Sequence, residues 1–315
     1  MKVSICIPTY NRVHLLVEAL ESCINQTFKP HEIIIGDDST NYETERKIKN
    51  YKVSSEISIR YFHNVPSLKQ SKNINMLFNA ARGDKVMLLH DDDLLLPRAV
   101  EKLVNCFYEQ PDVKIAFGKQ YILNGYGQID QAASEKLNTD YYRVHKYEGS
   151  ILTSLEAGFV QQFPNDGYML DASVLKNVNY RTNSSTVGEL GYGCEYDFGI
   201  QLGMHNYKMY FVNEYIGKYR LSTANSISSS VNDDACLKSF LILRKIEVPK
   251  SSQLLKELHL KNKAGIAVSQ AAIHLTKKEA VQLFFSKWHR GKIFTLGGIK
   301  RLMLILFPCF FATRA

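Results

Sequence analysis

Three consecutive carboxylates, Asp91, Asp92 and Asp93, end an apolar run in the stretch LLHDDDLLLP, residues 88–97. Adjacent carboxylates repel one another unless water, a basic side chain or a cation offsets their charge. Hard divalent cations take oxygen ligands, and Mg²⁺ sites usually combine one or two carboxylates with phosphate and water. The cluster is therefore a candidate metal site, and the alternative is a solvated turn at a strand end. We interpret the preceding His90 as a residue that packs at the end of the strand.

Two further clusters of polar residues directly follow apolar runs that are typical of strands. The stretch PTYNR, residues 8–12, follows the run VSICI, and Asp37 and Asp38 follow the β-branched run Ile33–Ile35. Short β-branched runs that end at Gly or Asp indicate buried strands. A structural alternative remains for Asp37 and Asp38, because Asp accepts hydrogen bonds from the backbone N–H groups at the start of a helix.

Strands and helices alternate along the first part of the chain. Helical spacing begins at Val13, with Asn11 as the expected N-cap, and the elements that follow alternate in the same way. Such an alternation predicts an α/β fold with a largely parallel sheet and helices on both of its faces. We expect strands at residues 3–8, 33–35, 57–64, 85–93 and 114–123, and helices at 13–24, 41–51, 67–81 and 98–110.

The order of these elements predicts where a ligand would bind. In open α/β sheets, ligands bind outside the carboxyl ends of the strands. Residues 8–12, Asp37–Ser39 and Asp91–Asp93 each follow a strand, so we expect them to meet in one crevice.

The second half of the chain is less regular. Residues 125–185 are expected to form an excursion over the sheet, and residues 208–221 to form paired strands. Residues 193–204 resume helical spacing, and the chain is expected to be mainly helical after about residue 232. We therefore predict a domain at residues 1–230 and a helical C-terminal extension at residues 231–315.

Four stretches, in this order and spacing, resemble the family 2 glycosyltransferases of the GT-A fold. They are PTYNR (8–12), IIIGDDS (33–39), SKNINMLFNAARGDKVMLLHDDD (71–93) and CEYDFGIQL (194–202), and the resemblance covers about residues 1–225. It implies a nucleotide-diphospho-sugar transferase fold with a mostly parallel central sheet. It also implies transfer of a sugar from a nucleoside diphosphate to an acceptor hydroxyl, with inversion and with Mg or Mn as the cofactor.

The resemblance gives the acidic cluster a role. A divalent cation that bridges the phosphates stabilises, as a Lewis acid, the negative charge of the leaving group. Asp92 is the first expected ligand, and Asp91 and Asp93 are expected either to support the metal, Asp93 as a second ligand, or to contact the ribose. His90 stands where the family frequently has its first Asp.

The resemblance also implies which residues bind the nucleotide. Asp38 would accept the imino hydrogen of the base with help from Asp37. Lys72 offers a charge without the bidentate fork of Arg, and its alternative is an ordinary solvated helix lysine. The remaining residues implied for the nucleotide slot, the ribose and the diphosphate are Pro8, Thr9, Arg12 and Asn73.

An inverting transfer needs a general base that takes the proton of the acceptor hydroxyl. The family's Glu-Asp motif usually supplies it, and this chain has Cys194, Glu195, Tyr196 and Asp197 there. Aligning the motif by the apolar spacing that follows it places Glu195 at the position of the base. Shifting this alignment by two residues places Asp197 there instead. Both carboxylates could instead simply stabilise a helix start through its dipole.

A second departure from the family pattern follows near residue 220. Relatives often carry a His shortly after Tyr-Arg that completes the metal shell, and Ser222 takes that place here. Either water supplies that ligand or the metal is held more weakly than is usual. Arg220 remains a candidate contact for phosphate.

Composition limits the classes of protein. With 315 residues, 45% of them hydrophobic, the chain fits a large domain with or without an appendage. Its six cysteines form no C-x-x-C pair, so neither zinc nor a disulfide framework is indicated and a reducing cytosol fits best. The N-terminus reads as a strand instead of a signal peptide, and no stretch reaches the roughly 18 apolar residues that span a bilayer.

The net charge of +8 favours an anionic partner. Residues 281–315 contain six Lys and Arg and no acidic residue, interleaved with aromatic and aliphatic residues. This pattern fits a segment that lies at a membrane surface, and the alternative is a terminal helix docked on the domain or on a second copy. We expect a cytoplasmic protein, with peripheral contact at the inner face of the cell membrane. Nucleic acid fits poorly, because the basic residues concentrate in an apolar tail.

The resemblance therefore implies a hexosyl- or N-acetylhexosaminyl-transferase that uses UDP, as is usual in the family. Its acceptor would be a glycan or a lipid-linked oligosaccharide of a bacterial surface polysaccharide. A nucleotidyltransferase would typically open with a Gly-rich phosphate loop that PTYNR does not provide. A catalytically degenerate nucleotide-sugar-binding subunit is the alternative, and Cys194 and Ser222 at usual motif positions favour it.

Overall fold

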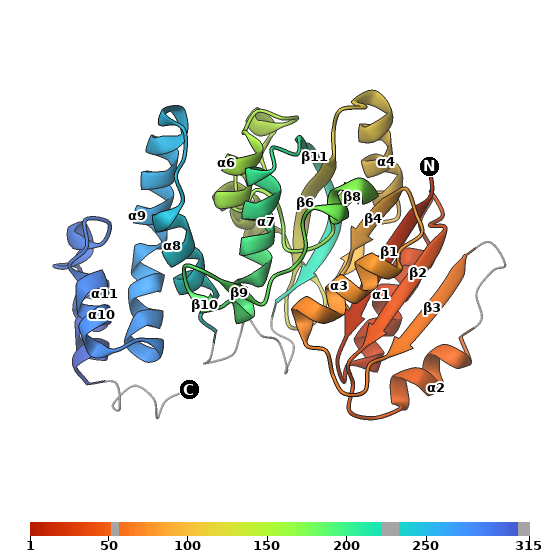
Figure 1. Cartoon of the computed structure of the whole chain (residues 1–315), viewed down its shortest axis with the longest axis horizontal. Helices are drawn as coiled ribbons and strands as arrows, with labels where there is room; N and C mark the ends of the chain where they lie inside the picture. The colour runs from red at the N-terminus through yellow and green to blue at the C-terminus, as the bar shows by residue number, and fades with distance from the viewer. Residues whose placement is uncertain (52–56, 222–232, 308–315) are drawn as a thin grey trace. The chain divides into compact units, whose positions relative to one another are not determined.

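The computed structural model describes residues 1–51, 57–221 and 233–307, which form two compact units (Figure 1). The first unit comprises Met1–Tyr180 and the chain from Phe198 to residue 221. The second unit comprises Arg181–Asp197 and the described residues from 233 onward. The expected domain boundary between residues 230 and 231 lies outside the described residues and stays a prediction.

The first unit is built on one nine-stranded sheet, in the order β3-β2-β1-β4-β8-β6-β11-β5, with β7 paired to β6. The ladders among β1, β2, β3 and β4 are parallel, as is the ladder between β6 and β11, so the expected mostly parallel sheet is confirmed. The strands are β1 (Val3–Thr9), β2 (Glu32–Asp37), β3 (Ser58–His63), β4 (Lys85–Leu88), β5 (Leu94–Leu95), β6 (Ile115–Leu123), β7 (Ile129–Asp130), β8 (Met169–Asp171) and β11 (Met209–Arg220).

Helices of the first unit cover the sheet. Side chains of α1 and α4 share one buried core with the β1 and β2 residues Ile5, Ile7, Ile33 and Ile35. Helix α3 contacts β1 and β2 and buries Ile74, Leu77 and Phe78, which lie outside that core cluster. The helices are α1 (Val13–Ile24), α2 (Glu43–Lys49), α3 (Gln70–Ala80), α4 (Ala99–Glu109), α5 (Gln131–Asp140) and α6 (Ser154–Phe159).

Residues 125–185 differ from the expected excursion over the sheet. Strand β8 enters the sheet between β4 and β6 and pairs antiparallel with both. Its side chains Met169 and Leu170 are buried. A strand of three residues carries too little period-two alternation to be recognised in the sequence.

The paired strands expected at residues 208–221 are also a wrong prediction. This segment forms the single strand β11, which pairs with β6 with register shifts between Val212 and Tyr215 and between Tyr215 and Gly217. A bulge inserts unpaired residues into a ladder without ending the strand. Residues 208–221 therefore contain one strand with a bulge instead of two paired strands.

Asn11 does not cap α1, because Arg12 is the N-cap residue and makes no capping bond. Asn11 has a φ of 53°, in the left-handed region where Asn is enriched. Its backbone N donates to Ser39 Oγ at 2.7 Å and its Oδ1 accepts from Thr40 N at 3.0 Å. The residue therefore joins the loops that follow β1 and β2.

The second unit is mainly helical, which confirms the expected C-terminal helical region. Helix α9 contacts α8, α10 and α11, and it buries Leu260, Ala264 and Val268. The helices are α8 (Ala235–Lys245), α9 (Lys250–His274), α10 (Lys277–Phe284) and α11 (Leu296–Leu306), with a 3₁₀ turn at Arg290–Lys292 and a hairpin of β9 (Asn183–Ser184) and β10 (Gly188–Glu189). Helix α7 (Cys194–Met204) contains the point where the chain passes from the second unit to the first.

No helix among the described residues combines the length and the apolar character needed to cross a bilayer.

Candidate active site

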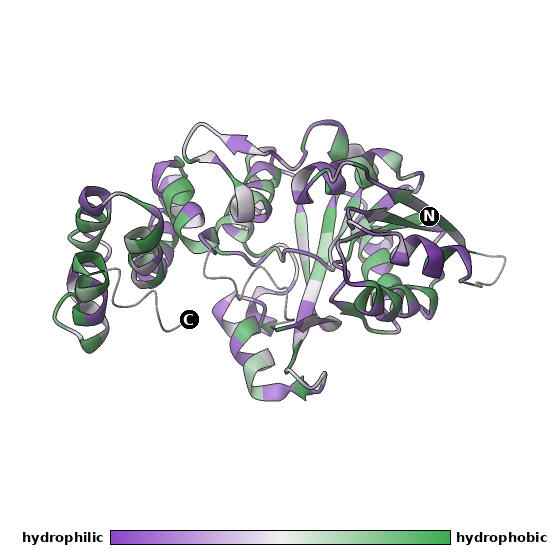
Figure 2. Cartoon of the chain, turned by 90° about the horizontal axis from the view of Figure 1, so that it is seen from below, coloured by the Kyte–Doolittle hydropathy of each residue, from purple (hydrophilic) through white to green (hydrophobic). Residues whose placement is uncertain are grey.

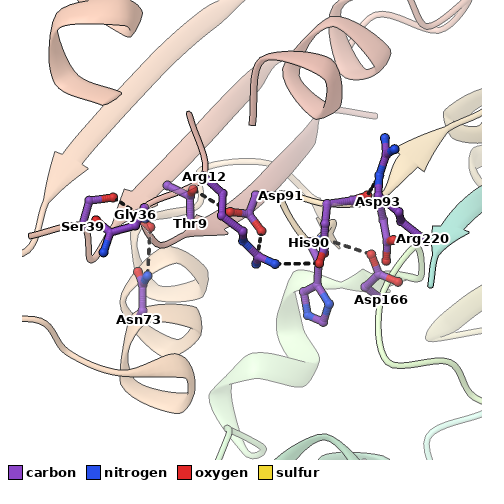
Figure 3. A network of polar contacts seen from close by, with 12 residues as sticks. Thr9, Arg12, Gly36, Ser39, Asn73, His90, Asp91, Asp93, Asp166 and Arg220 are labelled. Carbon is purple, nitrogen blue, oxygen red and sulfur yellow. Dashed lines mark hydrogen bonds and ion pairs between the residues drawn. The ribbon is translucent and has the colours of Figure 1, made fainter. Parts of the chain in front are cut away.

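The acidic cluster follows β4 at the carboxyl edge of the sheet. Cys6 of β1 pairs with Leu88 of β4, and Leu89 N donates to Cys6 O at 3.0 Å, so the chain beyond β4 runs beside the end of β1. Thr9 Oγ1 donates to Asp91 Oδ2 at 2.6 Å. Figure 3 shows Thr9 and Arg12 directed toward Asp91. The expected meeting of the segments after β1, β2 and β4 is therefore confirmed by these contacts and by those of Asn11.

Asp91 is buried and is held by fixed partners. Arg12 forms an ion pair with it through one terminal guanidinium nitrogen, and Thr9 donates to its other oxygen. Burial raises the pKa of Asp91 to about 6, with Asp92 also raising it, although Arg12 and the Thr9 hydrogen bond lower it. Its two carboxylate oxygens are thus occupied within the protein.

Asp92 is the second partner of Arg12. Arg12 Nη1 donates to Asp92 Oδ2 at 2.7 Å, and both side chains keep some access to solvent. Burial opposes the charge of Arg12, but Asp91 and Asp92 together raise its pKa. One guanidinium therefore offsets two of the three carboxylates in the cluster.

Asp93 is the carboxylate that the protein satisfies least. Its Oδ1 accepts from Arg220 N at 2.8 Å, whereas its buried Oδ2 has no hydrogen-bond partner among the described residues. Burial raises the pKa of Asp93 well above its usual range, and the neighbouring Asp166 and Asp92 raise it further. A buried carboxylate oxygen without a donor is costly, and a cation is one group that would relieve it.

Three side chains lie close enough together to hold a cation. One ligand atom from each of His90, Asp92 and Asp93 lies within 4.8 Å of the other two. Two carboxylates and an imidazole form a donor set that suits Mn²⁺ and related divalent ions. The residues therefore fit a divalent cation, and His90, which we interpreted as a packing residue, lies inside the cluster.

Asp166 is a member of the site that sequence reasoning missed. It is buried in the segment before β8; its Oδ2 accepts from His90 N at 2.9 Å and its Oδ1 from Gln120 Nε2 at 3.2 Å. Figure 3 shows it beside His90 and Asp93. No spacing relates Asp166 to the acidic run, and the only local signal is the turn glycine Gly167, whose N donates to Leu88 O at 2.8 Å.

Asp37 and Asp38 are both buried and neither caps α2. Asp37 accepts from Ser39 N at 2.8 Å and from the Tyr61 hydroxyl at 2.6 Å. Asp38 Oδ1 accepts from Asn64 Nδ2 at 2.9 Å and from Leu68 N at 3.0 Å. The pair therefore organises the loops beyond β2 and β3.

Lys72 and Asn73 are neighbours in α3 with different surroundings. Asn73 is buried, and its Nδ2 donates to Gly36 O at 2.8 Å, which ties α3 to the end of β2. A Cβ at Gly36 would lie 2.1 Å from Asn73 Oδ1, so this close approach requires glycine. Lys72 is exposed and Pro8 is half-buried.

Arg220 fixes the loop that carries the acidic cluster. Its Nε donates to Asp92 O at 3.0 Å, and its Nη2 pairs with Glu18 Oε2 at 2.7 Å. Arg220, a candidate contact for phosphate, therefore already binds groups of the protein itself. The position of Ser222 lies outside the described residues.

The two candidate bases, Glu195 and Asp197, belong to the second unit. Glu195 is half-buried. Asp197 is buried and forms a two-pronged ion pair with Arg181, whose Nε donates to Asp197 Oδ2 at 2.8 Å. The two carboxylates therefore differ in access to solvent and in the charge beside them.

Comparison with known families gives two overlapping matches. Residues 4–159 match the family described as Glycosyl transferase family 2, and residues 85–242 match Glycosyl transferase family group 2. An uncharacterized glycosyltransferase of Methanocaldococcus jannaschii is 26% identical over 233 residues, which is 73% of this chain and 74% of that protein. A GalNAc(5)-diNAcBac-PP-undecaprenol beta-1,3-glucosyltransferase of Campylobacter jejuni is 38% identical over 105 residues, and this match covers 33% of either chain.

Two solved structures share the fold over almost the whole chain. S. aureus TarS 1–349 in complex with UDP-GlcNAc gives a TM-score of 0.61 at 14% identity, covering 97% of this chain and 90% of that one. A mannosyltransferase of Pyrobaculum calidifontis in complex with GDP-Man and Mn²⁺ gives a TM-score of 0.59 at 13% identity, covering 98% and 88%. The expected GT-A fold is confirmed by these likenesses.

Proposed function

This chain belongs to the family 2 glycosyltransferases, and we propose that it is an inverting, metal-dependent member that uses a nucleoside-diphosphate sugar. The acceptor is a hydroxyl of a glycan or a lipid-linked oligosaccharide in surface polysaccharide synthesis. The observation that carries this proposal is the buried acidic cluster at the carboxyl ends of β1 and β4, in which Asp93 Oδ2 has no hydrogen-bond partner among the described residues.

We assign the cation to Asp92 and Asp93, with His90 as a third ligand, because their ligand atoms lie within 4.8 Å of one another. When bound, Mg²⁺ or Mn²⁺ supplies the Lewis acidity that stabilises the diphosphate leaving group. The family typically uses a divalent metal. An imidazole ligand favours Mn²⁺ over Mg²⁺, which prefers oxygen donors and keeps its water.

The nucleotide would lie along the loops that follow β1, β2 and β4. Asp38 accepts the imino hydrogen of the base, and Asp37 keeps the loop beyond β2 in place through Ser39 N. Pro8 and Thr9 line the slot, and Thr9 orients Asp91 toward the ribose through its 2.6 Å hydrogen bond.

Two basic residues complete the proposed nucleotide site. Arg12 is the cationic side chain beside Asp91 and Asp92, so it is placed to contact the diphosphate. Lys72 is exposed on α3 and adds a point charge for the phosphates, while Asn73 holds α3 against β2.

We propose Glu195 as the general base. Its carboxylate takes the proton of the acceptor hydroxyl while that oxygen forms a bond to the anomeric carbon, and the bond from that carbon to the diphosphate breaks. Asp197 suits this role less well, because it is buried against Arg181 and its charge is already offset. Asp197 instead positions the first turn of α7.

The relatives support a donor of the nucleotide-sugar class. TarS binds UDP-GlcNAc and the mannosyltransferase binds GDP-Man with Mn²⁺, so the fold accommodates more than one base. The C. jejuni relative is named for an undecaprenol-linked acceptor, which supports a lipid-linked acceptor for this chain. A UDP donor that carries a hexosyl or N-acetylhexosaminyl group is our first choice.

Calorimetric titration of the full chain with UDP, GDP and dTDP, each with and without Mn²⁺, tests the donor site. Manganese-dependent binding of one nucleotide, followed by sugar transfer from the matching donor, is the expected result. Binding without any transfer would identify a degenerate subunit, and an absence of binding to all three nucleotides would overturn the proposed site.

The role of His90 has a spectroscopic test. Mn²⁺ bound to the full chain with nucleotide should show coupling to an imidazole nitrogen in pulsed electron paramagnetic resonance, and His90→Gln should remove that coupling. His31→Gln, a change at an exposed histidine in the same unit, is the matched control. A nitrogen signal that persists in His90→Gln would exclude His90 as a ligand.

A further inference from the structure

The last described helix, α11, presents a stripe of apolar side chains to solvent. Leu296, Ile299, Met303 and Leu306 are all exposed, and Leu296 retains 82% of its accessible surface. Their spacing of three, four and three residues puts them on one side of the helix. An ordinary surface helix carries its apolar stripe toward the core, so this arrangement is reversed.

The opposite side of α11 is the side that packs within the second unit. Arg301 Nε donates to Gly265 O of α9 at 2.7 Å, and Ile305 is buried. A Cβ at Gly298 would lie 2.1 Å from Lys292 O, so the start of α11 also lies close against the preceding turn. These contacts fix the rotation of α11 about its axis, and the apolar stripe is therefore held outward.

Aromatic residues extend the exposed apolar surface at both ends of the helix. Phe294, just before the N-cap residue Thr295, retains 96% of its accessible surface, and Phe307 follows the last turn. Figure 2 shows hydrophobic residues in green along the C-terminal helices at the left of the view. We call the set Phe294, Leu296, Ile299, Met303, Leu306 and Phe307 the α11 surface. Single exposed apolar residues are ordinary, but a set on one helix indicates an interaction surface.

The net positive charge of the whole chain comes from the segment that carries this surface. Residues 258–307 contain nine Lys and Arg and one acidic residue, Glu279, a net charge of +8, while the rest of the chain has 30 basic and 30 acidic residues. Arg290 and Lys300 are exposed and make no ion pair with any residue in the described parts of the chain. The segment therefore combines outward apolar groups with unpaired positive charge.

Positive charges are also crowded behind α11. Lys292 Nζ donates to Lys261 O at 2.9 Å, and Arg301 lies near enough for its charge to act on Lys292. Burial lowers the pKa of Lys292, and Arg301 and Lys261 lower it further. Such crowding makes an anionic surface a favourable neighbour.

We propose that the α11 surface docks on an anionic lipid bilayer, with the apolar residues among the acyl chains and Arg290 and Lys300 at the headgroups. The charge selects this occupant, because a second copy of the chain would bring the same net charge of +8 against it. Eleven helical residues are too short to span a bilayer, so the helix lies in the interface. The inference goes beyond the proposed reaction, since a protein without activity would still bind.

Co-sedimentation of the full chain with vesicles tests the inference. Vesicles with roughly one third phosphatidylglycerol should pellet the protein, whereas phosphatidylcholine vesicles should pellet much less, and added salt should weaken binding. The double variant Leu296→Ser/Ile299→Ser should bind at least about tenfold more weakly, because apolar insertion is lost. Both side chains are exposed, so circular dichroism should stay unchanged.

Matched control variants distinguish binding through the α11 surface from non-specific binding to vesicles. Arg290→Gln/Lys300→Gln should weaken binding to anionic vesicles, and Lys47→Gln, an exposed lysine of α2, should not. Tyr126→Ser, at a side chain that retains 90% of its accessible surface in the first unit, is the control for the apolar variant. Manganese-dependent nucleotide binding, measured alongside, should be equal in all variants, so a failure of the transferase proposal is distinguished from a failure of this one.

Two outcomes would overturn the inference. Equal binding to both vesicle types, or equal binding of the apolar variant and the parent chain, would show that the α11 surface does not recognise anionic lipid. A mass by light scattering that falls from dimer to monomer in Leu296→Ser/Ile299→Ser, without any vesicle binding by the parent chain, would assign the surface to a second copy.

Discussion

The acidic edge of the first unit, which is the edge of the sheet that carries Asp91–Asp93, and the α11 surface of the second unit depart in opposite ways from the usual burial of apolar and exposure of charged side chains. The first unit buries Asp91 and Asp93 away from water, while the second unit exposes Leu296 and Phe294 to it. Burying a carboxylate without a full set of donors costs free energy, and so does exposing a contiguous set of apolar groups. We therefore propose a partner outside the chain for each region: a cation with a diphosphate for the acidic edge, and an anionic lipid surface for the α11 surface.

The largest expected effect concerns the proposed metal site at the acidic edge. Asp92→Asn should lower kcat by about 100-fold or more, because the leaving-group charge loses its metal. Asp92 pairs only at the edge of the cluster with Arg12, so the thermal midpoint should change little. Sugar transfer and Mn²⁺ affinity are the measurements.

The matched control for that change is Asp112→Asn, an exposed carboxylate of the same unit that pairs with Lys208. It should leave both the transfer rate and Mn²⁺ affinity unchanged. Full activity in Asp92→Asn would remove Asp92 from the metal site.

The next prediction tests whether the second unit supplies the general base in addition to the α11 surface. Glu195→Gln should lower kcat by roughly 100-fold, the usual size of general-base catalysis, and leave nucleotide binding intact. Transfer kinetics together with calorimetric nucleotide binding make the distinction.

Asp197→Asn distinguishes the two alignments of the motif, in which either Glu195 or Asp197 is the general base. It leaves Arg181 without its buried partner and should lower the free energy of unfolding by about 1–2 kcal/mol. Some transfer activity should remain in the folded fraction. A variant that folds normally but loses transfer would make Asp197 the base instead.

A third prediction concerns the pH dependence of stability in the second unit. Burial lowers the pKa of His259 on α9 to about 3, with Lys263 lowering it further. The folded chain therefore holds this histidine neutral, while the unfolded chain binds a proton below about pH 6.5. The free energy of unfolding should fall by about 2 kcal/mol between pH 7 and pH 5.

Trp288 is the single tryptophan of the chain and lies in the second unit, where its Nε1 donates to Glu257 at 2.7 Å. Its fluorescence during urea unfolding at several pH values measures this prediction. His259→Gln should flatten the pH dependence, and an unchanged slope in that variant would assign the effect to other groups.

The smallest expected effects concern Lys72 and Asn73, two neighbouring residues of α3. Lys72→Gln should weaken nucleotide binding by a factor of about 2–5 and leave stability unchanged, because the side chain is exposed. Asn73→Ala should instead cost about 1–2 kcal/mol of stability, because Gly36 O loses its donor. Calorimetric binding and urea unfolding of both variants test the contrast, and a stability loss in Lys72→Gln would contradict it.

Parallel strands explain why much of the acidic edge could be predicted. The carboxyl ends of adjacent parallel strands meet at one edge, so Thr9, Asp37 and Asp91 had to lie near one another once the strands were identified. Asp166 could not be found this way. It reaches His90 only because the short strand β8 enters the sheet between β4 and β6, and a three-residue strand has almost no sequence pattern.

Two other side chains, Asn11 and His90, were singled out in the sequence, but their contacts were not predicted correctly. Asn11 was expected to cap α1, yet its positive φ lets it join the loops after β1 and β2. His90 was interpreted as a packing residue, and the turn after β4 brings it into the acidic cluster. Such outcomes depend on the exact path of the backbone in a turn, which composition and periodicity do not specify.

The sequence by itself determined the alternation of strands and helices, the acidic residues at the strand ends and the basic, apolar character of the C-terminal segment. Those features follow from local periodicity and residue type, which each stretch of chain carries alone. Only the tertiary structure decided that one oxygen of Asp93 has no hydrogen-bond partner among the described residues, that Asp197 pairs with Arg181, and that α11 turns its apolar side outward. Each of these depends on a partner distant in the sequence, such as Gly265 for Arg301, and contacts of that kind are set by packing.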